Sequence, residues 1–224
     1  MVEGRTSNVE GWLLLQLSDS AFPTGGFAHS GGLEAAVQAK LVSSERDVWR
    51  WLGDAVWGIG WSALPFVSAA SAGALAEVDA ACDAFLTSAV ANRASRTQGR
   101  AFVETCARVF PHPEVAALRV EARPRPCHHA PMFGAVTRAL GASADEARRV
   151  FLHLSLRGLA SSAVRLGVIG PHLAQRMCFD LHDTLERVAA DCAELSVDEA
   201  AWTAPLQELI GGTHERLYSR LFVS

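Results

Sequence analysis

The sequence lacks the features that would place a protein in an oxidising compartment or in a membrane. Its five cysteines are odd in number and include no Cys-x-x-Cys pair, so they favour free thiols over a disulfide framework. The first ten residues carry three charged side chains where a secretory signal would have an apolar core. No apolar run approaches the roughly 20 residues of a membrane-spanning helix. We therefore expect a cytoplasmic protein without a membrane partner.

Basic charge is also scarce. The 20 Lys and Arg residues are outnumbered by 24 Asp and Glu residues, which gives a formal net charge of −4. A nucleic-acid surface needs clustered cations to neutralise phosphates, and the sequence has no basic stripe, so we expect no nucleic-acid partner. The chain has 224 residues and half of them are hydrophobic, which is enough for one domain spanning residues 1–224 with its own core.

Alternating strand patterns are absent, and apolar residues instead recur at helical spacing. The clearest run follows Ser44, which with Asp47 forms a candidate capping box. We expect Pro65 to open a separate helix, because its fixed φ suits a first helical turn. The apolar positions from Val78 to Cys106 predict one long amphipathic helix. The first run places these residues on one helical face: Val48, Trp51, Leu52, Ala55, Val56 and Ile59.

Five prolines between residues 111 and 131 exclude a continuous helix there, because each removes an amide donor and fixes φ. We expect this Pro-rich connection to divide the chain into two helical halves. Beyond it, Ser143 and Glu146 form a second candidate capping box. The helix that follows is apolar on nearly every side from residue 150 to residue 168, which predicts that it is the buried centre of the fold.

The C-terminal third continues the helical pattern. One helix is expected to carry the apolar positions from Leu173 to Cys192, and Ser196 with Glu199 should begin a shorter one. The predicted fold class is therefore all-α, a single-domain bundle of roughly ten helices without significant β-sheet.

The most unusual local sequence is the glycine-rich segment from Thr24 to Gly32. It lacks the Gly-Lys-Ser/Thr ending of a phosphate loop, and Ser30 is not preceded by the glycine of a nucleophile elbow. We expect a turn in which glycines adopt positive φ. An enzyme that uses His29 and Ser30 remains an alternative, although no third group that would orient a base can be assigned, so we predict no catalytic residue.

Two histidine-containing motifs suggest metal binding without completing a site. The pair His214-Glu215 resembles the start of a zinc-protease helix, but Tyr218 stands where the second histidine should be. The adjacent Cys127, His128 and His129 are possible ligands, although consecutive residues rarely all face one ion. We predict no metal site and no cofactor.

Four segments resemble the UreF family of urease accessory proteins. The longest is Leu15–Glu34, which contains the pattern Pro-x-Gly-Gly-Phe-x-His-Ser-x-Gly-Leu-Glu in a loop after a helix. The other three, in the same order as in the family, are His129–Gly134, Ser162–Pro171 and His214–Phe222. The resemblance spans the chain, but residues 70–127 match only in helical character.

The resemblance implies an all-helical homodimer that performs no chemistry of its own. It would bind a second accessory protein, UreD (also called UreH), recruit the GTPase UreG, and help deliver nickel to apo-urease. The alternative is a direct nickel carrier that uses Cys127, His128 and His129. We assign partner binding to Pro23, Gly25, Gly26, Phe27, His29, Ser30, Glu34, Arg165, His214, Tyr218, Arg220, Leu221 and Phe222.

The tail, residues 214–224, is rich in apolar side chains and carries the only tyrosine of the chain, Tyr218. Tyrosine and arginine are enriched at interface hot spots, so we expect this tail to dock on a partner. In that case, deletion of residues 218–224 should leave the melting temperature nearly unchanged. The alternative is that the tail folds back onto the chain's own core.

Overall fold

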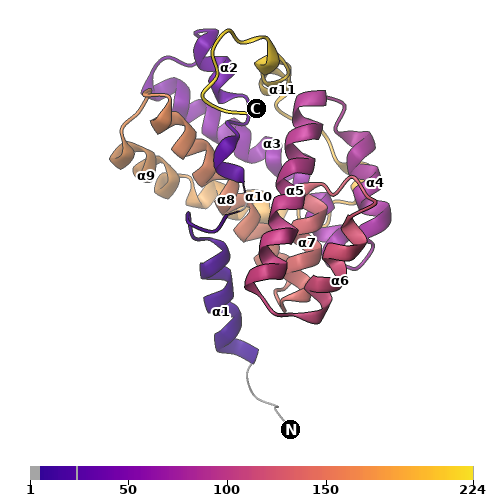
Figure 1. The fold of residues 1–224 in the computed structure, drawn as a ribbon. Helices are drawn as coiled ribbons and strands as arrows, with labels where there is room; N and C mark the ends of the chain where they lie inside the picture. The colour runs from indigo at the N-terminus through magenta and orange to yellow at the C-terminus, as the bar shows by residue number, and fades with distance from the viewer. Residues whose placement is uncertain (1–5, 24, 224) are drawn as a thin grey trace.

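The protein is all-helical in a computed structural model, which describes residues 6–23 and 25–223 and the side chains from residue 11 onward (Figure 1). Within these ranges there are eleven α-helices, three short 3₁₀ helices and no strand, which confirms the predicted fold class. None of the described helices is long and apolar enough to cross a membrane. The elements are α1 (Thr6–Leu17), η1 (Gly26–Ala28), α2 (Leu33–Gln38), α3 (Glu45–Ser71), α4 (Leu75–Phe85), α5 (Ala89–Val109), α6 (Pro113–Ala122), α7 (His129–Ala139), α8 (Ala144–Arg165), α9 (Pro171–Asp180), α10 (His182–Asp191), η2 (Val197–Glu199), α11 (Pro205–Gly212) and η3 (His214–Arg216).

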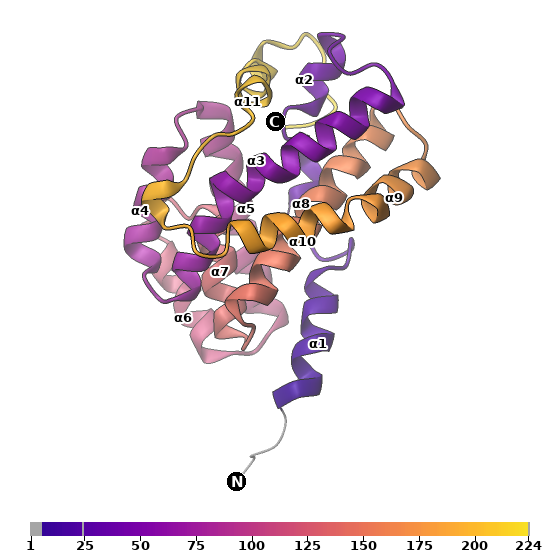
Figure 2. The same cartoon turned by 180° about the vertical axis from the view of Figure 1, so that it is seen from behind.

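Helix α3 is the longest described helix and crosses the body of the molecule (Figure 2). Its start confirms the predicted capping box of Ser44 and Asp47. The prediction that Pro65 opens a separate helix is wrong, because α3 continues through this residue. Pro65 has no N–H to donate to the carbonyl of Trp61. The backbone N–H of Ala201 donates to that carbonyl instead, at 3.1 Å, so a distant segment replaces the missing hydrogen bond.

The most enclosed helix is α7, in which nine of eleven residues are buried. It packs chiefly against α3 and α5. At Gly134 the backbone of α7 lies so close to that of α3 that a Cβ atom would be 2.1 Å from the carbonyl oxygen of Val67. The prediction of a buried centre between residues 150 and 168 is therefore wrong. Although the capping box of Ser143 and Glu146 is confirmed, α8 buries only nine of its 22 residues. Its first half exposes Asp145, Arg149 and His153.

Two helices that the apolar spacing predicts as continuous are each broken in two. Between α4 and α5 the chain turns, and the Ser88 side chain caps the new helix by accepting a hydrogen bond from the N–H of Ala91. Between α9 and α10 the break lies at Leu181. In both cases apolar residues keep helical spacing across the break, so periodicity alone does not reveal it. The predicted short element at Ser196 has its capping box but is a 3₁₀ helix.

The prolines of the connection between residues 111 and 131 mark helix starts. Pro113 occupies the first turn of α6, and Pro131 lies in the first turn of α7, where a missing amide donor costs no intrahelical bond. Apolar residues from both sides of this connection belong to one hydrophobic core. The helices before and after the Pro-rich connection therefore share their packing.

Candidate partner-binding surface

The glycine-rich loop adopts the predicted turn. Gly25, Gly31 and Gly32 have φ of 75°, 58° and 83°, a region that side chains other than glycine avoid. Gly32 also lies against α11, where a Cβ atom would be 3.0 Å from the Cα of Gly211. The loop therefore brings the start of α2 close to the C-terminal part of the chain.

Glu34 in α2 anchors that C-terminal part. Its side chain is 2% exposed, yet its carboxylate accepts three hydrogen bonds. The N–H groups of Leu221 and Phe222 donate at 2.6 and 3.2 Å, and the ring Nε2 of His214 lies at 2.8 Å. A buried carboxylate is stable only when such donors replace water. Glu34 therefore fixes the path of the tail.

His214 is the side-chain partner of Glu34 and is itself fully buried. The contact between Nε2 of His214 and Glu34 is the only side-chain hydrogen bond of this carboxylate within the described part of the chain. The other ring nitrogen, Nδ1, has no hydrogen-bond partner within the described part of the chain. Nearby, burial lowers the pKa of His29, and His214 lowers this pKa further. At neutral pH the ring of His29 is therefore uncharged.

Arg165 at the end of α8 joins the loop to the tail. Its guanidinium lies 3.9 Å from the ring centroid of Phe27 and 4.1 Å from that of Phe222, and it donates to the carbonyl of Phe27. Cation–π contacts of this kind contribute about 0.5–2 kcal/mol each. Together with Glu34 and His214, these residues form what we call the tail-anchor cluster: Phe27, Glu34, Arg165, His214 and Phe222.

One side chain of the tail, that of Phe222, is buried in the chain's own fold, whereas others are exposed. Phe222 is 4% exposed, and the N–H of Val223 donates to the carbonyl of Ala28 at 2.8 Å. Tyr218 is fully exposed, and Leu221 is 53% exposed. The structure therefore favours the alternative in which the tail folds back onto the chain. Deletion of residues 218–224 would remove a buried phenylalanine and its hydrogen bonds, so we now expect it to lower the melting temperature.

The other predicted partner-binding residues do not form one surface with this cluster. Ser30 is buried, and its hydroxyl accepts from the N–H of Glu34 at 3.4 Å. Arg220 is exposed in the tail, whereas Pro23 lies apart, with its carbonyl accepting from the hydroxyl of Thr105 in α5. Gly25 and Gly26 shape the loop backbone.

One apolar surface was missed from the sequence. Helix α1 projects away from the body (Figure 1) and makes hardly any contact with the other described helices. Its side chains Trp12 and Leu15 are 73% and 63% exposed. The run of apolar residues in α1 was the available signal, but sequence spacing does not tell whether a helix packs on its own chain or outside it.

A pocket of about 1040 Å³ is lined by residues of the glycine-rich loop and of α3, α4, α5, α7, α8, α9 and α11. His29 and His129 line it, whereas Ser30 does not. An enzyme that uses His29 and Ser30 together would need both side chains at one cavity. The geometry therefore gives this alternative no support.

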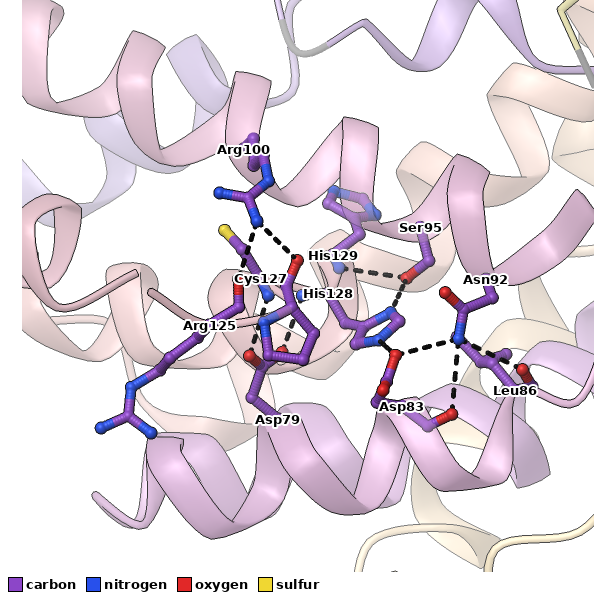
Figure 3. Close-up of polar contacts among 11 residues, drawn as sticks. Asp79, Asp83, Leu86, Asn92, Ser95, Arg100, Arg125, Cys127, His128 and His129 are labelled. Atoms are coloured by element: carbon purple, nitrogen blue, oxygen red, sulfur yellow. Dashed lines mark hydrogen bonds and ion pairs between the residues drawn. The ribbon is translucent and has the colours of Figure 1, made fainter. Parts of the chain in front are cut away.

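Cys127, His128 and His129 lie at the start of α7, where they form hydrogen bonds with α4 and α5 (Figure 3). The carboxylate of Asp79 in α4 accepts from the backbone N–H groups of Cys127 and His128, at 2.8 and 2.7 Å. The ring of His128 is held at both nitrogens, 3.0 Å from Asp83 and 3.1 Å from Ser95. The contacts of Asp79 satisfy two backbone amides at the start of α7, where helices leave N–H groups without intrahelical acceptors.

The same three residues do not converge on one point. Figure 3 shows the His128 ring directed towards Asp83 and the sulfur of Cys127 directed elsewhere. Burial raises the pKa of the Cys127 thiol to about 11, and burial lowers the pKa of His129 to about 4. A metal needs the thiolate form of cysteine. Among the described residues, no group of three or more His, Cys, Asp or Glu side chains is arranged to hold a metal ion.

Replacing Asp79 by alanine should lower the free energy of unfolding by about 2–4 kcal/mol, because two buried N–H groups lose their acceptor. Urea denaturation measures this change. Glu77 in the same helix is exposed, and its replacement by alanine is the matched control, expected to change stability by less than about 1 kcal/mol. Equal effects of the two variants would contradict the anchoring role of Asp79.

Comparison with known proteins gives one consistent result. A family model described as UreF matches residues 42–182. "Urease accessory protein F" of Arabidopsis thaliana is 36% identical over 232 residues, covering 100% of this chain and 97% of the relative. The protein of the same name in Oryza sativa subsp. indica is 33% identical, covering 94% and 84%. "Urease accessory protein UreF" of Mesorhizobium japonicum is 32% identical, covering 91% and 92%.

Proposed function

The chain belongs to the UreF family of urease accessory proteins, and on that premise we propose that it is a non-catalytic adaptor in urease maturation. It binds the accessory protein UreD (UreH), recruits the GTPase UreG, and so assists nickel delivery to apo-urease as a homodimer in the cytoplasm. Nickel is the cargo of this assembly. Membership of the family supports the role in urease maturation, and the partners are our proposal.

The observation that carries the adaptor role is exposed apolar surface at two places. Helix α1 exposes Trp12 and Leu15, and the tail exposes Tyr218 and Leu221. Large apolar side chains grouped on a surface are typical of protein interfaces, and tyrosine and tryptophan are enriched among their hot spots. We assign these four side chains to contact with UreD.

The tail-anchor cluster has a different part in this proposal. Glu34, His214 and Phe222 are buried, so they cannot contact a partner without opening the fold. They position the tail, while Tyr218, Arg220 and Leu221 face outward and make the contacts. The partner-binding residues proposed from the sequence therefore separate into an inner group that positions and an outer group that binds.

The test is a double variant of the outer group, Tyr218→Ala with Leu221→Ala. We expect capture of UreD in co-purification, and urease activity in cells that express the full accessory set, to fall about tenfold or more, because truncated hot-spot residues lose their contact area. The melting temperature should remain nearly unchanged, since neither side chain is buried.

The matched control is Val120→Ala in α6, which shortens an exposed apolar side chain elsewhere on the surface. This variant should capture UreD at the wild-type level. Wild-type capture by the double variant would show that the tail is not a docking surface, whatever the result of the control.

A further inference from the structure

The exposed face of α3 contains a notch between two tryptophans. Trp49, Gly53 and Trp57 follow each other at intervals of four residues, so they share one helical face. Gly53 leaves open space, because a Cβ atom there would meet no other atom within 4 Å. With Leu181 and Thr184 these residues line a groove of about 380 Å³, which we call the tryptophan notch. Its lining residues come from α3, from Leu181 and from the start of α10, which packs against α3.

Two arginines line the tryptophan notch, and a third lies beside one of its lining residues. Arg46 and Arg50 line it, and Arg187 of α10 donates to the hydroxyl of Thr184 at 3.3 Å. In the described part of the chain none of these three guanidinium groups forms an ion pair. Asp54 is the one acidic side chain among the lining residues. The chain as a whole has a formal net charge of −4, so this local excess of positive charge is opposite to that of the molecule.

We propose that the tryptophan notch binds a short acidic segment of a partner protein. One bulky aliphatic side chain of that segment enters the space above Gly53 between the indole rings, as an anchor residue does at an interface hot spot. Carboxylates next to the anchor pair with the arginines that have no ion-pair partner, which favours acidic over basic partners. This surface is separate from the tail, so the proposal does not depend on the binding of UreD.

The apolar notch decides between an acidic peptide and other anions. Phosphate groups would satisfy the arginines but would leave the space between the indoles unfilled. A leucine-sized side chain fills that space and removes apolar area of both tryptophans from water, which contributes about 25 cal/mol per Å². An apolar recess lined by two tryptophans and two arginines therefore fits an aliphatic residue with neighbouring carboxylates.

The test uses the full ¹⁵N-labelled chain and a blocked pentapeptide, Glu-Glu-Leu-Glu-Glu, followed by NMR. Six tryptophans give six indole N–H signals, and Trp→Phe variants assign those of Trp49 and Trp57. We expect these two signals to shift saturably while the other four do not. The Gln-Gln-Leu-Gln-Gln and Glu-Glu-Ala-Glu-Glu peptides should each bind about fivefold more weakly or worse, because each lacks one of the two required features.

A variant that fills the notch completes the test. Gly53→Leu places a side chain in open space on a helix, so it should keep or slightly raise the melting temperature and weaken peptide binding about tenfold or more. The control Ala117→Leu adds the same side chain on α6 and should bind as the wild type does.

Three results would overturn the proposal. The first is that no indole signal shifts at peptide concentrations up to about 10 mM, well above the range of weak specific binding. The second is that Gly53→Leu, or either altered peptide, binds as tightly as its parent. The third is that the Trp49 and Trp57 signals shift with protein concentration in the absence of peptide, which would make the tryptophan notch a contact between copies of the chain.

Discussion

Replacing Gly134 by alanine is expected to lower the free energy of unfolding by about 3 kcal/mol or more, because the new Cβ would lie 2.1 Å from the carbonyl oxygen of Val67. The atom it meets belongs to the backbone of α3, which cannot turn aside as a flexible side chain can. To accept the methyl group, α3 and α7 must separate, and the most enclosed helix loses packing along its length. Urea denaturation of the variant and the wild type measures the change.

The control for this prediction is the same substitution at Gly53. A Cβ atom there meets nothing within 4 Å, so Gly53→Ala should raise stability by about 0.5–1 kcal/mol through helix propensity alone. If Gly134→Ala is as stable as the wild type, α3 and α7 do not approach each other as closely at this position as described.

Replacement of Glu34 by alanine is the second change with a large expected effect. Three donors would lose their shared acceptor in a buried site, which costs about 2–4 kcal/mol, although the tail can reduce this cost by detaching and exposing the donors to water. We therefore expect hydrogen exchange at the amides of Leu221 and Phe222 to become faster, while amides of α7 keep their protection. Capture of UreD should fall as well, although Glu34 is buried and does not reach the surface.

Glu215→Gln is the matched control for Glu34→Ala. Glu215 pairs with Arg93 at the surface, where ion pairs contribute about 0–1 kcal/mol, so its replacement should leave both the tail amides and UreD capture nearly unchanged. Unchanged protection of Leu221 and Phe222 in Glu34→Ala would show that the carboxylate does not hold the tail.

Rules for local structure predicted the fold well where the deciding contacts are local. The capping boxes at Ser44 and Ser143 depend on residues three positions apart, and both formed as expected. Pro65 shows the limit of such rules. Its effect depends on whether the carbonyl of Trp61 finds another donor, and that donor, Ala201, comes from a distant part of the sequence. Tertiary contact therefore kept a helix that local reasoning ended.

The sequence predicted which residues belong to the candidate site, but not how these residues are arranged in space. The number of glycines in the glycine-rich loop predicted its positive φ values. The family resemblance supplied Glu34, Arg165 and His214 as candidate partner-binding residues. Their division into buried and exposed groups depends on how α2, α8 and the tail meet, which no local pattern contains. The exposure of Trp12 was missed for the same reason, since an apolar helix is expected to pack on its own core.

The sequence separation within the tail-anchor cluster has a kinetic consequence. The hydrogen bond from Leu221 to Glu34 joins positions 187 residues apart, and such distant contacts form late because a long loop must close first. The opposite event, release of the tail, breaks a few contacts at the edge of the molecule and leaves the shared core of α3 and α7 folded. We therefore expect the outer surface with Tyr218 and Leu221 to detach more often than the whole protein unfolds.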